Sequence, residues 1–330
     1  MIILGLGHFV PEDVLTNKQL EQIVNTSDEW ITTRTGIKAR RIAKKGVACS
    51  DLAYNAAINA LKRVRLDPID ITHIILGTFT SDYCAPATAC LLQAKLGSKN
   101  CEMAIDIAAG CSGFTYGLEL ARGIVSNKPE AKVLVVGSEV CSARINFKDR
   151  NTSVLFGDGA GAAIVTGRVD GYSEIIAKVI DIELKTVGEL GHLLMVGLEG
   201  GSASPFVVGQ RVSEKYFVRM NGREVFKHAV RNMTEISERI LKKNNLTSQD
   251  VDLFIPHQAN YRIIEAVAKK INLPMEKVFI NVHKYGNTSA ASIILALSEA
   301  YLYGRIQKGD LVLLATFGAG FTVASVILKF

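Results

Sequence analysis

Three pairs of segments repeat along this chain at a nearly constant separation of 176 to 179 positions. One pair shares the order of apolar strand, glycine turn and apolar helix, and the other two pairs match as short apolar strands. Self-similarity on this scale predicts two similar halves, residues 1–168 and 169–330. The paired segments are 69–78 with 248–257, 104–121 with 279–300, and 131–137 with 309–315.

The alternation of strand and helix patterns along both halves predicts a layered α/β fold. If the halves pack about a pseudo-twofold axis, equivalent loops meet at their interface. Cys111 and Asn287, 176 positions apart, would then start two facing buried helices. His257 would lie beside them at the end of a strand. Residues distant in sequence would therefore form a single site.

Composition limits the alternatives for this 330-residue chain. The net charge of +6 is too small to indicate nucleic-acid binding by itself. Six cysteines form no CxxC pair and no metal-like cluster, which favours a reduced, cytoplasmic protein without a metal. Residues 311–328 carry no charge, but the internal FGAG and many β-branched residues predict two buried strands around a turn. We therefore expect no membrane insertion.

Cys111 is the strongest candidate nucleophile. It follows Gly110 in AAGCSGF and precedes an apolar helix. A sharp turn at a helix N-terminus exposes the sulfur to the positive end of the helix dipole, which favours the thiolate. The other five cysteines lack such a turn, and a buried structural role is the ordinary interpretation for them.

His257 and Asn287 are the candidate partners of this thiol. His257 ends the strand pattern of IPHQAN, where a side chain can leave the core and face a pocket. Asn287 has an alternative role as the N-cap of the following helix. Together with Cys111 they offer a nucleophile and two neutral hydrogen-bonding groups. This set suits thioester chemistry in which an enolate oxygen is stabilised without a strong base.

Six motifs resemble the β-ketoacyl-acyl-carrier-protein synthase III family of thiolase-like condensing enzymes. The similarity extends from Gly5 to Phe330 in the family's order, and it implies a layered αβαβα fold with two pseudo-symmetric halves. The motifs are TSDEWITTRTGI (26–37), AAGCSGF (108–114), FGDGAGAA (156–163), IPHQAN (255–260), HKYGNTSAAS (283–292) and FGAGFT (317–322).

The resemblance implies a ping-pong condensation that starts fatty-acid synthesis. Cys111 matches the acylated nucleophile, and His257 and Asn287 match the pair that binds the malonyl thioester carbonyl. The backbone amides of Cys111 and Ala319 would form the oxyanion hole for the acyl group. The substrates would be an acyl-CoA and malonyl carried on acyl carrier protein, with no other cofactor, and the enzyme would be a homodimer.

Further positions are assigned by the same resemblance. Trp30, Arg34 and Arg150 match the residues that hold the adenine and phosphates of coenzyme A, for which an indole and guanidinium groups are suitable partners. Docking of the acidic carrier protein would use Lys227, which matches a docking position of the family, and residues in and after IPHQ at the start of a helix. A solvated charged face is the alternative interpretation. The docking residues would be Lys227, Gln258, Arg262, Lys269 and Lys270.

The sequence also departs from the family pattern. Val323 and Ala324 stand where the family commonly has Trp-Gly. Ala85 occupies a position that often carries a larger side chain in the acyl pocket, which predicts a wider pocket and a longer primer. The Gly-rich stretch 183–215 is longer than in compact members, and we expect a surface loop near the pocket mouth that would offer an alternative filling for that volume.

Two alternatives differ in class. One is a related Cys-His-Asn condensing enzyme or acyltransferase of secondary metabolism. The other is a non-catalytic module that binds carrier protein. Chain-elongating synthases would have His in place of Asn287, and degradative thiolases would have a second cysteine near the FGAG loop. Neither feature is present in the sequence.

Overall fold

The computed structural model describes residues 1–168, 172, 175–197 and 216–330. Nine strands form one mixed sheet in the order β11-β12-β13-β8-β1-β7-β6-β4-β5. The strands are β1 (Ile2–Phe9), β4 (His73–Gly77), β5 (Met103–Ile107), β6 (Val133–Glu139), β7 (Gly159–Thr166), β8 (Ala177–Thr186), β11 (Leu253–Pro256), β12 (Leu311–Gly318) and β13 (Thr322–Lys329).

The sheet consists of two halves with the same topology. One has the order β1-β7-β6-β4-β5, and the other repeats it as β8-β13-β12-β11. At the position that corresponds to β5 of the first half, the second half has a parallel β-bridge between Phe254 and Val278. The halves meet at β1 and β8, where only Ile2 and Ile3 pair with Lys178 and Ala177. The predicted pseudo-symmetric fold is thereby confirmed.

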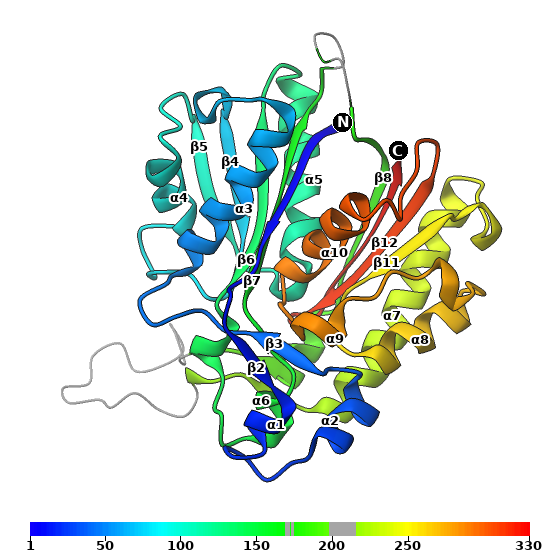
Figure 1. The fold of residues 1–330 in the computed structure, drawn as a ribbon. Helices are drawn as coiled ribbons and strands as arrows, with labels where there is room; N and C mark the ends of the chain where they lie inside the picture. Colours follow the sequence, from blue (N-terminus) through cyan, green and yellow to red (C-terminus); the bar gives the residue numbers. More distant parts are fainter. Residues whose placement is uncertain (169–171, 173–174, 198–215) are drawn as a thin grey trace.

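Helices cover both faces of each half-sheet and produce five layers (Figure 1). Buried apolar clusters fill the space between successive layers. Since the central strands are buried on both faces, their sequences are continuous apolar runs. Helices α5 (Gly113–Asn127) and α10 (Ala291–Leu302) form the middle layer, α3 (Cys49–Val64) and α4 (Thr88–Leu96) cover the first half, and α7 (Gly222–Lys243) and α8 (Tyr261–Lys270) cover the second.

Small elements gather at one end of the layered core (Figure 1). There, β2 pairs with β3 and β9 pairs with β10, both antiparallel. The elements are β2 (Val14–Thr16), α1 (Asn17–Leu20), α2 (Asp28–Thr35), β3 (Ala39–Arg41), α6 (Arg150–Ser153), β9 (Leu194–Met195), β10 (Arg219–Met220) and α9 (Val282–Tyr285).

The expectation of a surface loop over 183–215 is partly wrong. Residues 183–186 continue β8, where they pair with β13. A short 3-10 helix, Gly188–Leu193, and β9 follow. The glycines of this stretch suggested a loop. The residues that precede them instead satisfy their backbone hydrogen-bonding groups by pairing in the sheet. Residues 198–215 lie outside the described part. The predicted division of the chain at residue 168 borders residues 169–171, which also lie outside the described part. This division stays a prediction.

The uncharged segment 311–328 forms two strands, as expected. β12 and β13 pair antiparallel in the centre of the second half-sheet. Val323 and Ala324, the departure from the family pattern, are fully buried in β13 opposite Lys185 and Leu184. Among the helices of the described residues, none has the length and apolar character needed to cross a membrane.

Candidate active site

Cys111 lies in a tight turn where the two halves touch. It belongs to the 3-10 turn Gly110–Ser112, which leads directly into α5. Gly110 has a φ of 51° and packs against the loop after β12, so that a Cβ there would lie 2.7 Å from the amide nitrogen of Ala319. A Cβ on Gly318 would likewise lie 2.6 Å from the amide nitrogen of Cys111. Glycine is therefore required on both sides of this contact.

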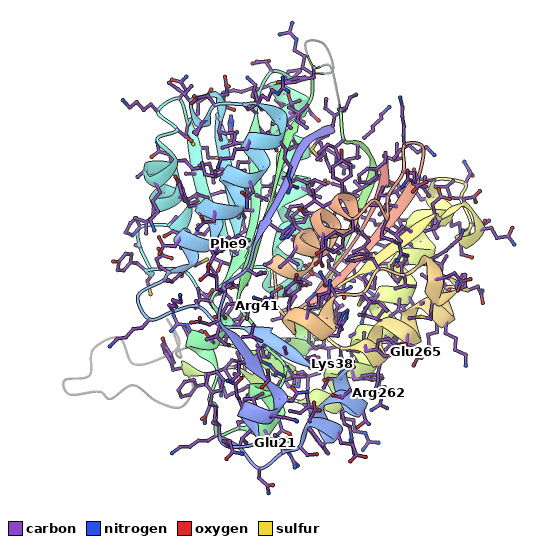
Figure 2. The ribbon with its side chains drawn as sticks, in the orientation of Figure 1. Phe9, Glu21, Lys38, Arg41, Arg262 and Glu265 are labelled. Atoms are coloured by element: carbon purple, nitrogen blue, oxygen red, sulfur yellow. The ribbon has the colours of Figure 1, made fainter. Side chains whose placement is uncertain are left out.

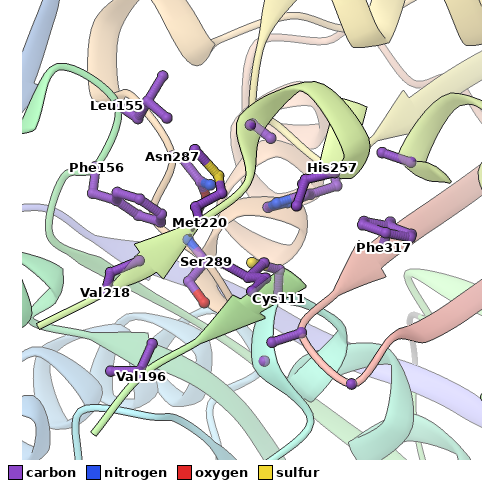
Figure 3. Close-up of a pocket in the computed structure, with 18 of the residues that line it drawn as sticks. Cys111, Leu155, Phe156, Val196, Val218, Met220, His257, Asn287, Ser289 and Phe317 are labelled. Atoms are coloured by element: carbon purple, nitrogen blue, oxygen red, sulfur yellow. Dashed lines mark hydrogen bonds between the residues drawn. The ribbon is translucent and has the colours of Figure 1, made fainter. Parts of the chain in front are cut away.

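The structure brings Cys111, His257 and Asn287 together, as the sequence predicts. All three line one cavity of about 480 Å³, and Figure 3 shows their side chains around its centre. His257 follows β11, and Asn287 lies between α9 and α10. The remaining walls are mainly apolar, as is typical of a site for a small molecule. They include Phe79, Leu155, Phe156, Leu194, Val196, Val218, Met220, Phe226 and Phe317.

His257 is held as a neutral imidazole. Its side chain is 3% exposed, and burial lowers the pKa of its ring to about 3. The Nδ1 atom lies 2.5 Å from the hydroxyl oxygen of Ser292. When this hydroxyl donates to Nδ1, Nε2 carries the ring hydrogen and can donate it into the cavity. Ser292 was not predicted as a site residue from the sequence, although it is the last residue of the HKYGNTSAAS motif.

Asn287 is fixed with its amide group available as a donor. Its Oδ1 accepts a hydrogen bond of 2.8 Å from the amide of Ser289, which leaves Nδ2 for a ligand. Its backbone is tied to Leu155 and Gly157 by bonds of 2.8 and 3.0 Å. The following helix α10 begins at Ala291, with Ala290 as its N-cap. The alternative role of Asn287 as a helix cap is therefore wrong.

Burial opposes the activation of Cys111 that the helix dipole is expected to provide. The Cys111 sulfur lies in a turn before α5 and is almost fully enclosed, and burial raises the pKa of its thiol. Activation by the dipole stays a prediction.

The two residues predicted to supply the oxyanion hole, Cys111 and Ala319, both line the cavity. Cys111 is in the first turn of its 3-10 helix, where N–H groups lack partners within the helix. The amide of Ala319 follows the end of β12 and makes no backbone hydrogen bond within the described residues. The glycine contact described above holds the two loops together, which fits their predicted use as an oxyanion hole.

The structure also brings Trp30, Arg34 and Arg150 together. The guanidinium carbons of Arg34 and Arg150 lie 5.6 and 4.7 Å from the centre of the Trp30 ring. Trp30 lines a groove of about 690 Å³, and this groove shares Leu155, Met195, Met220 and Gly222 with the inner cavity. The groove therefore adjoins the inner cavity, and we refer to it as the entrance groove. Arg219 and Arg223 also line it, and we did not anticipate them from the sequence.

The predicted docking residues divide into two groups. Lys227, Arg262, Lys269 and Lys270 are exposed, and Figure 2 shows Arg262 at the surface of α8. Arg262 lies 5.7 Å from the ring of Phe226, which lines the cavity, so it marks the pocket mouth.

The inclusion of Gln258 among these residues is wrong. Its side chain is 1% exposed and is engaged in the fold. Nε2 donates to the carbonyls of Pro256 and Phe279, and Oε1 accepts from the amides of Asn281 and Val282. Gln258 therefore holds neighbouring loops together below the surface.

Ala85 does not line the cavity of the single chain. It is exposed, in a surface segment that includes Tyr83, which is also exposed. The prediction of a pocket widened by Ala85 is therefore wrong for this cavity. The alternative, in which residues of the stretch 183–215 fill the pocket volume, has support. Leu194, Met195 and Val196 from the segment after β8 line the cavity.

Comparisons with known proteins agree with this geometry. The family described as 3-oxoacyl-[acyl-carrier-protein] synthase III matches residues 105–188, and its C-terminal counterpart matches residues 241–330. The β-ketoacyl-[acyl-carrier-protein] synthase III of Nitratidesulfovibrio vulgaris strain DP4 is 52% identical over 329 residues, which cover 100% of this chain and 98% of the relative.

Solved structures show the same relationship. The crystal structure of 3-oxoacyl-[acyl-carrier-protein] synthase III from Aquifex aeolicus matches with a TM-score of 0.89 and 44% identity, covering 100% of this chain and 99% of that one. The corresponding synthase III structure from Thermus thermophilus matches with a TM-score of 0.90, 44% identity and the same coverage. The chain therefore belongs to the 3-oxoacyl-[acyl-carrier-protein] synthase III family.

Proposed function

We propose that this enzyme condenses an acyl-CoA primer with malonyl-acyl-carrier protein and so initiates type II fatty-acid synthesis. One observation carries the proposal. A thiol, Cys111, and two neutral hydrogen-bond donors, His257 and Asn287, line the same apolar cavity. This arrangement combines a nucleophile for acyl transfer with donors for an enolate oxygen.

In the first half-reaction, the primer is transferred to the enzyme. The sulfur of Cys111 attacks the thioester carbonyl, the amides of Cys111 and Ala319 hold the developing oxyanion, and coenzyme A leaves as its thiolate. The proton of the Cys111 thiol is released to solvent, and the coenzyme A thiolate takes a proton from solvent, so that the half-reaction has no net change in protons. The product is an acyl-cysteine enclosed by apolar walls.

In the second half-reaction, malonyl-acyl-carrier protein enters the emptied site. Nε2 of His257 and Nδ2 of Asn287 donate to its thioester carbonyl oxygen. Loss of carbon dioxide leaves an enolate on that oxygen, and its carbon attacks the acyl-cysteine. The new carbon–carbon bond gives 3-oxoacyl-acyl-carrier protein and returns the sulfur of Cys111 as a thiolate. No base strong enough to deprotonate an acetyl group is needed.

The primer end of the cavity supports a short acyl chain. Phe79, Phe156, Val196 and Val218 belong to one apolar cluster that borders the site of Cys111. We propose acetyl or a somewhat longer acyl group as the primer. Each methylene buried against this cluster would contribute about 0.8 kcal/mol.

The entrance groove suits the nucleotide of coenzyme A. The Trp30 indole offers a stacking surface for adenine, and Arg34 and Arg150 beside it offer charges for phosphates. The exposed basic residues near the mouth suit the acidic carrier protein. Six free cysteines fit a reducing, cytoplasmic location, which is part of the proposal together with a homodimeric assembly.

A primer panel tests the proposal. The enzyme is incubated with acetyl-, butyryl-, isobutyryl- or octanoyl-CoA, and peptide mass spectrometry locates the acyl group. We expect it on Cys111, and we expect 3-oxoacyl-acyl-carrier protein once malonyl-acyl-carrier protein is added. Cys90→Ala, which removes an exposed cysteine, serves as the matched control and should behave like the wild type. Acylation that persists in Cys111→Ala, or its absence with every primer, would disprove the proposal.

A further inference from the structure

A buried cation lies close to the segment that carries Asn287. Arg40, the middle residue of β3, is 0% exposed, and burial lowers the pKa of its guanidinium to about 10, so it keeps its charge at neutral pH. Its hydrogen bonds to described residues end on three neutral oxygens, at Leu15, Asn17 and Val154. A cation that is buried without a carboxylate costs free energy. This residue is therefore better explained by what it positions than by what it adds to stability.

The guanidinium of Arg40 joins two parts of the fold. On one side, Nη1 donates to the carbonyl oxygen of Leu15 at 3.2 Å and to Oδ1 of Asn17 at 2.8 Å. On the other side, Nη2 donates to the carbonyl oxygen of Val154 at 2.7 Å. A planar guanidinium reaches acceptors in two directions, whereas the ammonium of lysine is a compact point charge. Arg40 thus fixes the end of α6 against β2 and α1.

The segment that starts at Val154 supports Asn287 directly. Asn287 donates its amide to the carbonyl oxygen of Leu155 at 2.8 Å and accepts from the amide of Gly157 at 3.0 Å. These two bonds form a parallel bridge between Asn287 and Phe156. Figure 3 shows Leu155, Phe156 and Asn287 on the same side of the cavity. The main chain of Asn287 therefore follows the position of this segment.

The stem of Arg40 packs against the residues next to this bridge. A Cβ on Gly157 would lie 2.9 Å from the Cβ of Arg40, and a Cβ on Gly286 would lie 3.4 Å from it. Glycine at both positions leaves room for β3 to approach. β3 also lies beside α9, which precedes Asn287 in the chain (Figure 1). Arg40 therefore contacts both strands of the bridge that holds Asn287.

We propose that Arg40 is a positioning residue for Asn287. Its guanidinium fixes Val154, the segment after Val154 carries the bridge, and the bridge sets where Nδ2 of Asn287 lies in the cavity. A displacement of about 1 Å at a group that acts on the substrate is enough to lower the rate by one to two orders of magnitude. This role rests on the proposed function, because Asn287 acts there as a donor to the enolate oxygen.

Two half-reactions, measured separately in Arg40→Met, test this role. Malonyl decarboxylation uses Asn287, whereas acyl transfer to Cys111 does not. We expect the kcat of decarboxylation to fall at least about tenfold while the kcat of acyl transfer changes little. A merely structural role would instead lower both rates equally, through the fraction of folded enzyme. Equal loss of both half-reactions overturns the proposal.

Arg40→Lys separates the geometry of the guanidinium from its charge. Lysine keeps the charge but cannot hold Val154 and Asn17 at the same time, so this variant should show the same selective loss of decarboxylation as Arg40→Met. If Arg40→Lys decarboxylates like the wild type while Arg40→Met does not, the charge acts on its own. That result would overturn the positioning role.

Hydrogen exchange measured by mass spectrometry tests the same role without a substrate. If Arg40 holds the bridge, peptides that cover residues 154–158 and 284–289 should exchange at least about tenfold faster in Arg40→Met, and the peptide that covers Cys111 should exchange as in the wild type. Unchanged exchange at the bridge overturns the proposal. Asn17→Ala removes only one acceptor of Arg40 and serves if Arg40→Met does not fold. It should change exchange and decarboxylation in the same direction by a smaller factor, and no change in either would overturn the role.

The matched control is Arg41→Met, at the next position of β3. Nη1 of Arg41 also donates to backbone carbonyls, those of Pro11 and Glu12 at 3.2 and 3.1 Å, but these belong to another loop. Both half-reactions and the exchange of the bridge should stay as in the wild type. A loss equal to that of Arg40→Met would assign the effect to β3 as a whole and overturn the proposal. Absence of decarboxylation in the wild type would count against the proposed function and leave the exchange measurement intact.

Discussion

Nδ1 of His257 and the hydroxyl oxygen of Ser292 lie 2.5 Å apart, so the second residue of α10 orients the imidazole that follows β11. Ser292→Ala removes the partner that fixes the ring and its tautomer. We expect malonyl decarboxylation to fall about tenfold, less than after loss of His257 itself, with acylation of Cys111 preserved. Carbon dioxide release and intact-protein mass spectrometry measure the two reactions. Unchanged decarboxylation would show that Ser292 does not orient the ring.

The assigned roles of the three central residues predict separable defects. Cys111→Ala should abolish acyl transfer and retain decarboxylation, because the two donors survive. His257→Ala and Asn287→Ala should do the reverse, with decarboxylation reduced by about two to three orders of magnitude. The half-reactions are assayed separately, with each substrate alone. Normal decarboxylation by the Asn287 variant would refute the role given to that residue.

The buried neutral state of His257 makes stability depend on pH. Its pKa is lowered from 6.5 to about 3 in the folded protein, so unfolding takes up a proton below pH 6.5. The contribution of neutral His257 to the free energy of unfolding is therefore complete above pH 6.5 and is lost as the pH falls toward 3. Between pH 7 and 5, the free energy of unfolding should fall by about 2 kcal/mol more in the wild type than in His257→Gln. Urea titrations at both pH values measure this difference, and His192→Gln, which alters an exposed ring, should follow the wild type.

Substitutions in the entrance groove should weaken binding of acyl-CoA. Trp30→Ala and Arg150→Ala remove the stacking surface and one adjacent charge, and we expect the KM for acyl-CoA to rise about tenfold with little change in kcat. Arg305→Ala, which alters a distant exposed arginine, is the control. If the KM for malonyl-acyl-carrier protein rose equally, the groove would not be specific to the nucleotide.

The effect of a charge reversal on carrier docking should depend on how far the altered residue lies from the pocket mouth. Arg262 begins α8 at the mouth, whereas Lys270 ends that helix about 12 Å further along its axis. Charge reversal at Arg262 should therefore raise the KM for malonyl-acyl-carrier protein more than reversal at Lys270, and added salt should reduce both effects. Acylation by acetyl-CoA should not change. Equal damage to both half-reactions would contradict docking at this surface.

The sequence predicted the layered fold and the central residues because both depend on long-range repetition. The separation between Cys111 and Asn287 placed them at equivalent points of two halves, and the structure has them in one cavity. The apolar pattern of residues 311–328 likewise predicted two paired strands. Such features follow from periodicity and from turn residues that are visible in the chain itself.

Other properties depend on packing that no local pattern reveals. Gln258 follows His257 and has a polar side chain, yet four backbone partners hold it in the interior. Burial of the Cys111 thiol, which raises its pKa, likewise depends on the assembled cavity and is not visible in the local motif.

The reciprocal contact of Gly110 and Gly318 has an evolutionary consequence. Each half contributes a glycine that makes room for an amide of the other half, at Ala319 and at Cys111. After a duplication, one copy is ordinarily free to diverge. Here, a side chain acquired at either glycine would displace the amide on the opposite side, so neither half can change this loop on its own. The two loops must be inherited as a matched pair, even where the halves around them no longer share sequence.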